Sequence, residues 1–162
     1  MNKFTVPDIC DEHGENIKIC DLFLNSYGKN DKFFGQVETA RCEHSNSIVK
    51  ELVAQNGSNK VLVIQHTGNE KCSMVGDQIA QMAYDNQWKG IITNGYIRDI
   101  EVIKDIPIGV YAKNSYPRKT DKSVGKGEIG LTLEFQNFIV QKDSWVYVDT
   151  NGIIFSEKEL EF

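Results

Sequence analysis

The chain has 162 residues, 40% of them hydrophobic and 25% charged, which is typical of a globular protein that folds as one domain over residues 1–162. Its formal net charge of −5 argues against direct binding to nucleic acid, because phosphate binding requires concentrated Lys and Arg. The same charge suits a basic protein as a partner.

The cysteines and the hydropathy pattern predict a cytoplasmic protein. Cys10, Cys20, Cys42 and Cys72 form no CxxC pair, and the three histidines lie near no paired cysteines, so we expect reduced thiols and no zinc site. The first residues carry no apolar signal core, and no run reaches the ~20 apolar residues of a membrane helix. We therefore expect no membrane contact.

Short helices and strands alternate in the first part of the chain. A short helix is predicted over residues 8–12, and a strand over residues 34–42, where apolar and polar residues roughly alternate. Residues 45–47 can cap an amphipathic helix that ends at the Asn-Gly pair of residues 56 and 57. The apolar run over residues 60–65 predicts a strand that is buried on both faces.

The centre of the chain has the clearest pattern. A helix capped by Asp77 or Ser73 is predicted to run to Trp88, and residues 90–93 form a second buried strand. The segment between this strand and the next one opens with the pair Arg98-Asp99.

Arg98-Asp99 is predicted to begin a short helix that Pro107 terminates, and a third strand covers residues 108–112. Together with the strand over residues 60–65, these segments predict a β-α-β-α-β centre with parallel strands and right-handed crossovers.

The last part of the chain changes character. Residues 115–127 are polar, basic and glycine-containing, which predicts a loop. An Asp-Thr-Asn-Gly turn at residues 149–152 joins the last two strands. Alternating apolar and polar residues predict four strands, at residues 131–135, 138–140, 145–148 and 153–155. The fold class is therefore α/β, with an antiparallel β C-terminal tail.

The segment Gly76-Asp77-Gln78-Ile79 is the first candidate for ligand binding. If the helix begins here, its free backbone N–H groups and the positive end of its dipole form an anion site, and glycine allows a ligand to approach the backbone. The alternative is an ordinary helix start, which this segment alone does not exclude.

Arg98-Asp99 is the second candidate, and twenty residues separate it from Asp77. It follows a predicted buried strand, which is where open α/β sheets place their ligands. Arg98 can bind a carboxylate with two hydrogen bonds, and Asp99 can offer a hard oxygen to Mg²⁺ or Mn²⁺. The alternative is a surface ion pair at a helix start.

Three other features are interpreted as inert. His66 follows a strand and could act as a general base, but a lone histidine in a polar loop is more often without a role. Cys72 has no accompanying His-Asp set that would make it a nucleophile. The basic run over residues 118–122 is short and is interpreted as a solvated loop.

With these residues in place, the chain resembles the family of the regulator of ribonuclease E activity A and the class II 4-hydroxy-4-methyl-2-oxoglutarate aldolases. The resemblance covers nearly the whole chain. The aldolases carry an Asp, twenty residues and then Arg-Asp, and Asp77, Arg98 and Asp99 match that pattern. The regulators characteristically lose these acids and keep the Arg. Other matching segments are residues 5–11, 34–37, 60–64, 86–90, 95–98 and 149–154.

The resemblance implies a swivelling β/β/α fold in a homotrimer, sometimes paired into hexamers, with the active site between subunits. By that similarity Asp99 would bind the divalent metal and Asp77 would hold its waters. Arg98 and the N–H groups from Gly76 to Ile79 would bind the carboxylate of a small 2-oxo acid.

Two functions are therefore expected from the resemblance. The first is a metal-dependent lyase that cleaves 4-hydroxy-4-methyl-2-oxoglutarate to pyruvate and decarboxylates oxaloacetate, both through a pyruvate enolate. The alternative is a non-catalytic regulator that binds ribonuclease E, and an associated RNA helicase, and inhibits RNA processing.

Two details qualify the resemblance. The family often has a glycine-rich run where this chain has residues 65–69, and the bulkier side chains here could narrow the pocket or change the substrate. The family's site also takes an acid from a neighbouring subunit, for which Glu128 and Glu134 are the candidates.

Overall fold

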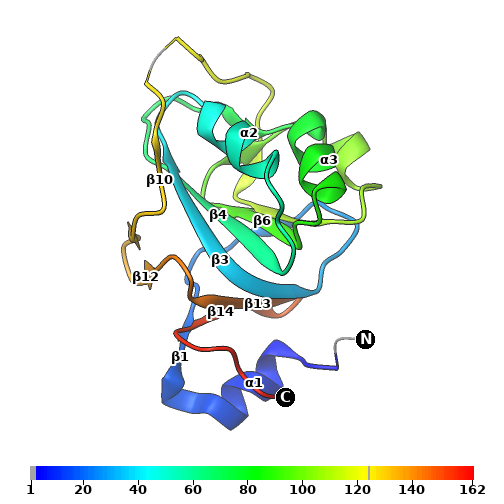
Figure 1. Cartoon of the computed structure of the whole chain (residues 1–162), viewed down its shortest axis with the longest axis vertical. Coiled ribbons are helices and arrows are strands. Elements are labelled where there is room, and N and C mark those ends of the chain that lie inside the picture. The colour runs from blue at the N-terminus through cyan, green and yellow to red at the C-terminus, as the bar shows by residue number, and fades with distance from the viewer. Residues whose placement is uncertain (1–2, 124) are drawn as a thin grey trace.

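The structure is a computed structural model that describes residues 3–123 and 125–162. Residues 1–2 and 124 lie outside the described residues. All three belong to the predicted single domain, and residue 124 also belongs to the predicted loop. A long mixed sheet forms the centre of the molecule, and the carboxyl terminus lies near α1 (Val6–His13) at its lower end (Figure 1).

Within the described residues the main sheet has nine strands, in the order β1-β14-β13-β3-β4-β6-β8-β2, and β10 pairs with β3. The first part of the sheet is antiparallel, whereas β3, β4, β6 and β8 are parallel. Its strands are β1 (Ile17–Ile19), β2 (Asn25–Ser26), β3 (Phe33–Cys42), β4 (Lys60–His66), β6 (Gly90–Thr93), β8 (Gly109–Ala112), β10 (Glu128–Ile129), β13 (Trp145–Asp149) and β14 (Gly152–Ser156).

This arrangement confirms the predicted α/β class, the β-α-β-α-β centre and the C-terminal antiparallel strands. The parallel unit also extends by one strand, because β3 pairs in parallel with β4. The β13–β14 hairpin closes at the predicted turn, where Asp149 pairs with Gly152. The remaining predicted strands form a separate hairpin of β11 (Leu133–Glu134) and β12 (Ile139–Val140).

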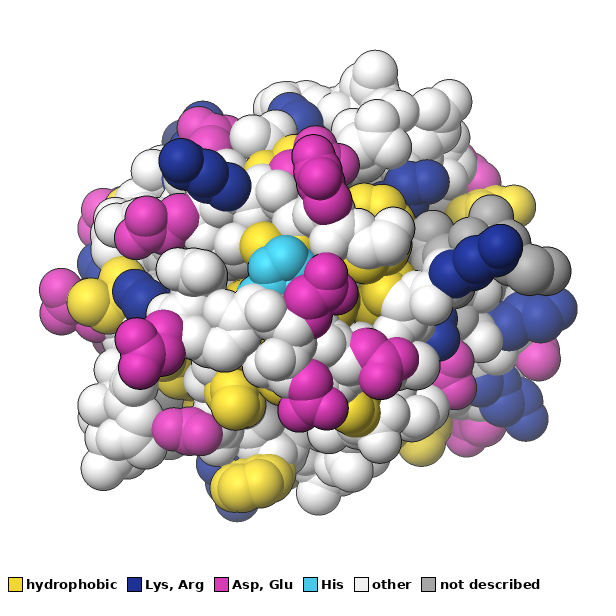
Figure 2. Space-filling view, turned by 90° about the horizontal axis from the view of Figure 1, so that it is seen from below, with side chains coloured by type: hydrophobic (Ala, Val, Ile, Leu, Met, Phe, Trp, Pro, Cys, Tyr) yellow, Lys and Arg dark blue, Asp and Glu magenta, His cyan; other side chains and the backbone are white. Residues whose placement is uncertain are grey.

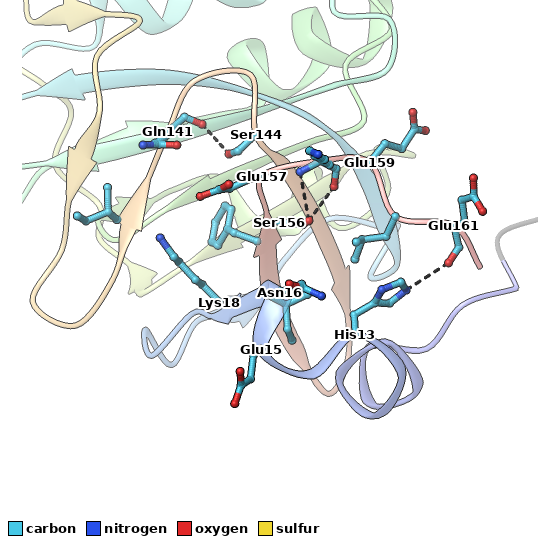
Figure 3. Close-up of a pocket in the computed structure, with 15 residues that line it drawn as sticks. His13, Glu15, Asn16, Lys18, Gln141, Ser144, Ser156, Glu157, Glu159 and Glu161 are labelled. Carbon is cyan, nitrogen blue, oxygen red and sulfur yellow. Dashed lines mark hydrogen bonds between the residues drawn. The ribbon is translucent and has the colours of Figure 1, made fainter.

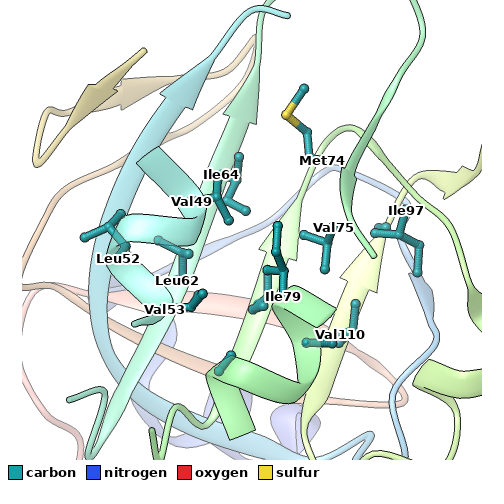
Figure 4. Packing of buried hydrophobic residues seen from close by; sticks show 14 of the residues in the cluster. Val49, Leu52, Val53, Leu62, Ile64, Met74, Val75, Ile79, Ile97 and Val110 are labelled. Atoms are coloured by element: carbon teal, nitrogen blue, oxygen red, sulfur yellow. The ribbon is translucent and has the colours of Figure 1, made fainter. Parts of the chain in front are cut away.

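The helices cover the parallel strands on one face. Figure 1 shows α2 (Ser47–Val53) and α3 (Asp77–Asp85) above β3, β4 and β6. The short α4 (Ile100–Ile103) follows, and a 3₁₀ turn over Gly14–Asn16 continues α1. Buried aliphatic side chains from α2, α3 and β4 meet between the helices and the sheet, as Figure 4 shows for Val49, Ile79 and Leu62. This packing fixes the position at which α3 begins.

Two details of α3 and α4 differ from the sequence-based expectation. The N-cap of α3 is Gly76, so neither Asp77 nor Ser73 caps it. Asp77 is the first helical residue and Ser73 belongs to a strand. Helix α4 ends at Ile103, well before Pro107, because a series of turns follows it.

A second, smaller sheet lies beside the first. It consists of three parallel strands in the order β5-β7-β9, and the sequence pattern did not predict it. Its strands are β5 (Ser73–Val75), β7 (Tyr96–Ile97) and β9 (Asn114–Ser115). Each strand follows a strand of the main sheet along the chain, so the polypeptide leaves the main sheet three times to build it. Among the described residues, no helix has the length and apolar character needed to cross a membrane.

The packing of Phe33 gives a first prediction. Phe33 is 3% exposed, and its ring lies directly against Gly90 and Gly109 on two neighbouring strands. A Cβ atom at residue 109 would overlap the ring, so Gly109→Ala is expected to lower the free energy of unfolding by about 1–3 kcal/mol. Urea unfolding measures this. Gly152→Ala is the control, because a Cβ there meets no described atom within 4 Å, and an equal loss in both variants would contradict the account.

Candidate active site

The small sheet brings the predicted site residues together. Gly76 follows β5 and Arg98 follows β7, and these strands are parallel. The Arg98 N–H donates to the carbonyl oxygen of Val75 at 3.0 Å, which joins the two strand ends. Arg98-Asp99 therefore lies at the carboxyl edge of the small sheet and not directly at the end of β6, as the sequence interpretation had it.

Asp99 and the start of α3 are in direct contact. The Asp99 Oδ2 atom accepts a hydrogen bond from the backbone N–H of Asp77 at 3.3 Å. A Cβ atom on Gly76 would lie 2.8 Å from the same oxygen, which is too close for an ordinary contact. Glycine at residue 76 therefore permits the Asp99 carboxylate to reach the amino-terminal end of α3.

The backbone of Asp99 explains how its side chain reaches α3. Asp99 has φ 59° and ψ 38°, the left-handed conformation, which is uncommon for residues other than glycine. It is the N-cap of α4, but among the described residues its side chain makes no capping bond to that helix. Such backbone strain persists where the surroundings impose it, and it often marks functional sites.

Arg98 lies between this carboxylate and the next strand end. Its Nε atom is 3.8 Å from Asp99 Oδ2, and its Nη1 donates to the carbonyl oxygen of Pro117 at 3.4 Å. The Arg98 and Asp99 side chains are 39% and 38% exposed, so solvent screens the ion pair and it adds little stability. Both charged groups remain accessible to a ligand.

These residues border a cavity of about 790 Å³, and all the predicted site residues line it: Gly76, Asp77, Gln78, Ile79, Arg98 and Asp99. Five basic side chains and three carboxylates line the same cavity, although the chain as a whole is acidic. The basic residues are Lys50, Arg98, Arg118, Lys119 and Lys122, and the acidic ones are Asp77, Asp99 and Asp121.

The basic loop is the part of the site that the sequence interpretation missed. Arg118, Lys119 and Lys122 lie in an exposed loop, as predicted, but they also line the cavity that contains Asp77 and Asp99. The sequence does contain a signal for this part of the site, because the basic run over residues 118–122 stands out in a chain of net charge −5.

The donor set suits a hard divalent cation with few protein ligands. Within residues 3–123 and 125–162, no group of three or more His, Cys, Asp or Glu could hold a metal ion. Mg²⁺ usually keeps several waters and binds through one or two carboxylates. Asp77 and Asp99, both at the cavity, offer carboxylates of that kind.

Glu128 and Glu134 lie elsewhere. Both are exposed, on β10 and β11, and of the residues that the structure describes neither belongs to the lining of this cavity. A role for either one would require a neighbouring copy of the chain.

His66 is held away from this cavity at the end of β4. The Asn94 side chain accepts from the His66 N–H at 2.7 Å and donates to its carbonyl oxygen at 3.2 Å. The His66 Nε2 atom is 3.9 Å from Cys72 Sγ, and burial lowers the pKa of His66 and raises that of Cys72. Both groups are thus favoured in their neutral forms, which agrees with a structural role.

The lowered pKa of His66 predicts a pH dependence of stability. The unfolded chain takes up the proton near pH ~6.5, before the folded chain does, so the free energy of unfolding falls as the pH drops below that value. His66→Gln lacks the titrating imidazole, so its free energy of unfolding is expected to change less with pH in this range. Urea unfolding at several pH values compares the two proteins, and identical slopes would contradict the expectation.

A second cavity of about 710 Å³ lies near the carboxyl terminus, between α1, β14 and the last residues (Figure 3). Four carboxylates and two lysines line it: Glu15, Glu157, Glu159 and Glu161 with Lys18 and Lys158. Figure 2 views the molecule from the α1 side and shows many Asp and Glu side chains on that face. The two ends of the protein therefore differ in charge, and none of the predicted site residues belongs to the acidic end.

Comparison with known proteins places the chain in a family. The chain is 38% identical to a protein from Vibrio vulnificus named "Putative 4-hydroxy-4-methyl-2-oxoglutarate aldolase", over 99% of both chains. It is 40% identical to a protein of the same name from Marinomonas sp., over 98% of both chains.

Solved structures share the fold. The RNA-processing inhibitor RraA from Thermus thermophilis aligns with a TM-score of 0.92 and 26% identity, over 99% of this chain and 96% of that chain. A structure titled S-adenosylmethionine:2-dimethylmenaquinone methyltransferase, from Geobacillus kaustophilus, aligns with a TM-score of 0.92 and 32% identity, over 97% of both chains. The family model described as RraA-like, Aldolase/RraA, matches residues 6–155. The chain therefore belongs to the RraA-like family.

Proposed function

We propose that the protein is a divalent-metal-dependent lyase acting on small 2-oxo acids. It would cleave 4-hydroxy-4-methyl-2-oxoglutarate to two molecules of pyruvate and decarboxylate oxaloacetate. The observation that carries the proposal is the Asp99 carboxylate, which reaches the start of α3 beside Arg98 in a cavity rich in cations. Relatives named as aldolases support it.

Asp99 would hold the metal ion, and Asp77 would hold its waters. Both carboxylates belong to the lining of one cavity, and solvent reaches Asp99. A bound Mg²⁺ or Mn²⁺ supplies Lewis-acid stabilisation of the negative charge that develops on the substrate oxygen.

The carboxylate of the 2-oxo acid would bind at the amino-terminal end of α3. The first N–H groups of a helix have no partner within the helix, and the Gln78 and Ile79 residues that carry two of them line the cavity. Arg98 would offer a guanidinium fork to the same substrate. It would also place positive charge where the enolate forms, which favours the transition state over the ground state.

Both reactions break the bond between C3 and C4 of the oxo acid and leave the electron pair on a pyruvate enolate. In the decarboxylation the other fragment is CO₂. In the retro-aldol reaction the hydroxyl proton on C4 passes to a base and the other fragment is pyruvate. A proton then adds to C3 of the enolate. In the proposed homotrimer or hexamer, Glu128 or Glu134 of a neighbouring copy is the candidate base, because both are exposed.

Pyruvate release from 4-hydroxy-4-methyl-2-oxoglutarate tests the proposal. With Mg²⁺ or Mn²⁺ the purified protein is expected to release two pyruvates per substrate, as measured by coupling to lactate dehydrogenase. EDTA is expected to stop the reaction and added metal to restore it. A rate equal to that of the metal alone would count against a lyase.

A second function has its own observation. The acidic face with Glu15, Glu157, Glu159 and Glu161 suits an Arg-rich segment of a protein partner, and a structural relative is titled an RNA-processing inhibitor. In this reading the protein binds ribonuclease E and inhibits RNA processing. Pull-down of purified ribonuclease E and slower cleavage of its RNA would support it, whereas no binding at low salt would reject it.

A further inference from the structure

The loop over residues 117–122 contributes side chains to the lining of the candidate active site that also contains Asp77 and Asp99. Arg118, Lys119 and Lys122 all line the cavity there. Three of the five cations that line the cavity belong to this loop, together with one of the three carboxylates, that of Asp121, so the loop contributes more positive than negative charge. The loop is therefore a source of positive charge in the same cavity as Asp77 and Asp99.

Buried hydrogen bonds hold this loop in place. The Ser73 N–H donates to the carbonyl oxygen of Arg118 at 2.8 Å, so the loop continues the small sheet beside β5. The Thr120 hydroxyl donates to Asn46 Oδ1 at 2.9 Å, and Asn46 Nδ2 donates to the carbonyl oxygen of Met74 at 2.9 Å. Asn46 and Thr120 are 8% and 7% exposed. The cations are therefore carried by a backbone that is fixed to α2 and β5.

The loop is also connected to Arg98, which is proposed to bind the carboxylate next to the 2-oxo group of the substrate. Arg98 Nη1 donates to the carbonyl oxygen of Pro117, the residue before Arg118. One ligand can then contact Arg98 and the loop together. Both proposed substrates carry a carboxylate at each end, so a second carboxylate needs cations in addition to Arg98, and the loop supplies them in the same cavity.

We infer that Arg118 and Lys119 bind the second carboxylate of the substrate and make the site selective for dicarboxylic 2-oxo acids over monocarboxylic ones. The inference rests on the proposed function for its substrate class. It assigns specificity to a loop that the lyase chemistry itself does not require.

The first test measures binding and needs no turnover. The ligands are 2-oxoglutarate, which has two carboxylates and lacks the C4 hydroxyl needed for cleavage, and pyruvate, which has one carboxylate. Calorimetry in the presence of Mg²⁺ is expected to show that the wild-type protein prefers 2-oxoglutarate. In Arg118→Ala/Lys119→Ala the affinity for 2-oxoglutarate is expected to fall roughly 10- to 100-fold, the usual cost of lost hydrogen bonds to a charged group, while that for pyruvate is unchanged.

Two further variants separate selectivity from general effects of charge. Lys126 is exposed, lies a few residues after the loop and is not one of the described residues that line the cavity. Lys126→Ala is therefore expected to leave the preference for 2-oxoglutarate over pyruvate intact. Arg118→Lys keeps the charge and is expected to retain most of the preference. An unchanged preference in the double variant, or an equal loss in Lys126→Ala, would overturn the inference.

Turnover then distinguishes this inference from the proposed function. The second carboxylate keeps its charge during aldol cleavage but loses it as CO₂ leaves, so the loop stabilises the transition state only in the aldol reaction. The double variant is expected to lose more kcat/KM for 4-hydroxy-4-methyl-2-oxoglutarate than for oxaloacetate. Its KM for oxaloacetate rises while kcat does not fall. A preference for 2-oxoglutarate without any turnover would reject the lyase and keep the loop as a dicarboxylate site.

Discussion

Replacement of Asp99 by Asn is expected to remove metal-dependent turnover of both substrates, with a loss of about 10³-fold or more, down to the rate of the metal alone. The substitution keeps the size of the side chain and removes the charged oxygen that would hold the ion. Asn also tolerates the left-handed conformation that residue 99 adopts, so the backbone is expected to persist. Pyruvate release measures the activity, and titration with Mn²⁺ followed by electron paramagnetic resonance measures metal binding.

The chain offers a matched control for this variant. Asp143 also has a positive φ, 68°, and is exposed outside the cavity lining. Asp143→Asn is expected to retain full activity and Mn²⁺ affinity. If Asp99→Asn keeps its turnover, or if both variants lose it equally, the assignment of Asp99 to the metal is wrong.

Replacement of Arg98 is expected to have the second-largest effect. Arg98→Ala should lower kcat/KM by about 10²- to 10³-fold, because it removes both the carboxylate contact and the positive charge next to the enolate. Arg98→Lys should recover only part of the loss, since an ammonium group lacks the planar fork that also donates to Pro117. Steady-state kinetics with both substrates measure these effects.

The result for Arg98 is distinguished from that for Asp99 by metal binding. Mn²⁺ affinity is expected to change little in Arg98→Lys, because Arg98 holds the substrate and not the ion. A parallel loss of metal affinity and activity in Arg98→Lys would mean that Arg98 acts by positioning Asp99. The Nε atom of Arg98 lies 3.8 Å from Asp99 Oδ2.

The parallel centre of the fold could be predicted from the sequence because its strands are continuous apolar runs. Residues 60–65 and 90–93 fall within β4 and β6, which are almost entirely buried. Helix α2 and the β13–β14 hairpin followed from an amphipathic pattern and an Asn-Gly turn. The spacing of Asp77, Arg98 and Asp99 also indicated that they could converge, and one cavity contains all three.

The small sheet could not be predicted in the same way. Its strands have two or three residues each, which is too short for a period of two to be recognised. They form through pairing with one another across long stretches of sequence, as Ser73 does with Tyr96. The basic loop depends likewise on a contact between Thr120 and Asn46, 74 residues apart, so its charges could not be assigned to the site from local sequence.

Fold similarity does not decide between the two proposed functions, because proteins with the same fold and similar sequences have names that refer to an aldolase, an inhibitor of RNA processing and a methyltransferase. The decision rests on the residues of the site. A regulator that acts only through its surface has no need of two carboxylates and Arg98 in one cation-lined cavity.

Oxaloacetate decarboxylation by the purified protein, with Mg²⁺ or Mn²⁺ and then with EDTA, tests this account most directly. The account predicts turnover above the rate of the metal alone, its loss with EDTA and its recovery when metal is restored. Turnover no faster than that of the metal alone would contradict the lyase, and binding to ribonuclease E would then become the leading explanation of the protein's function.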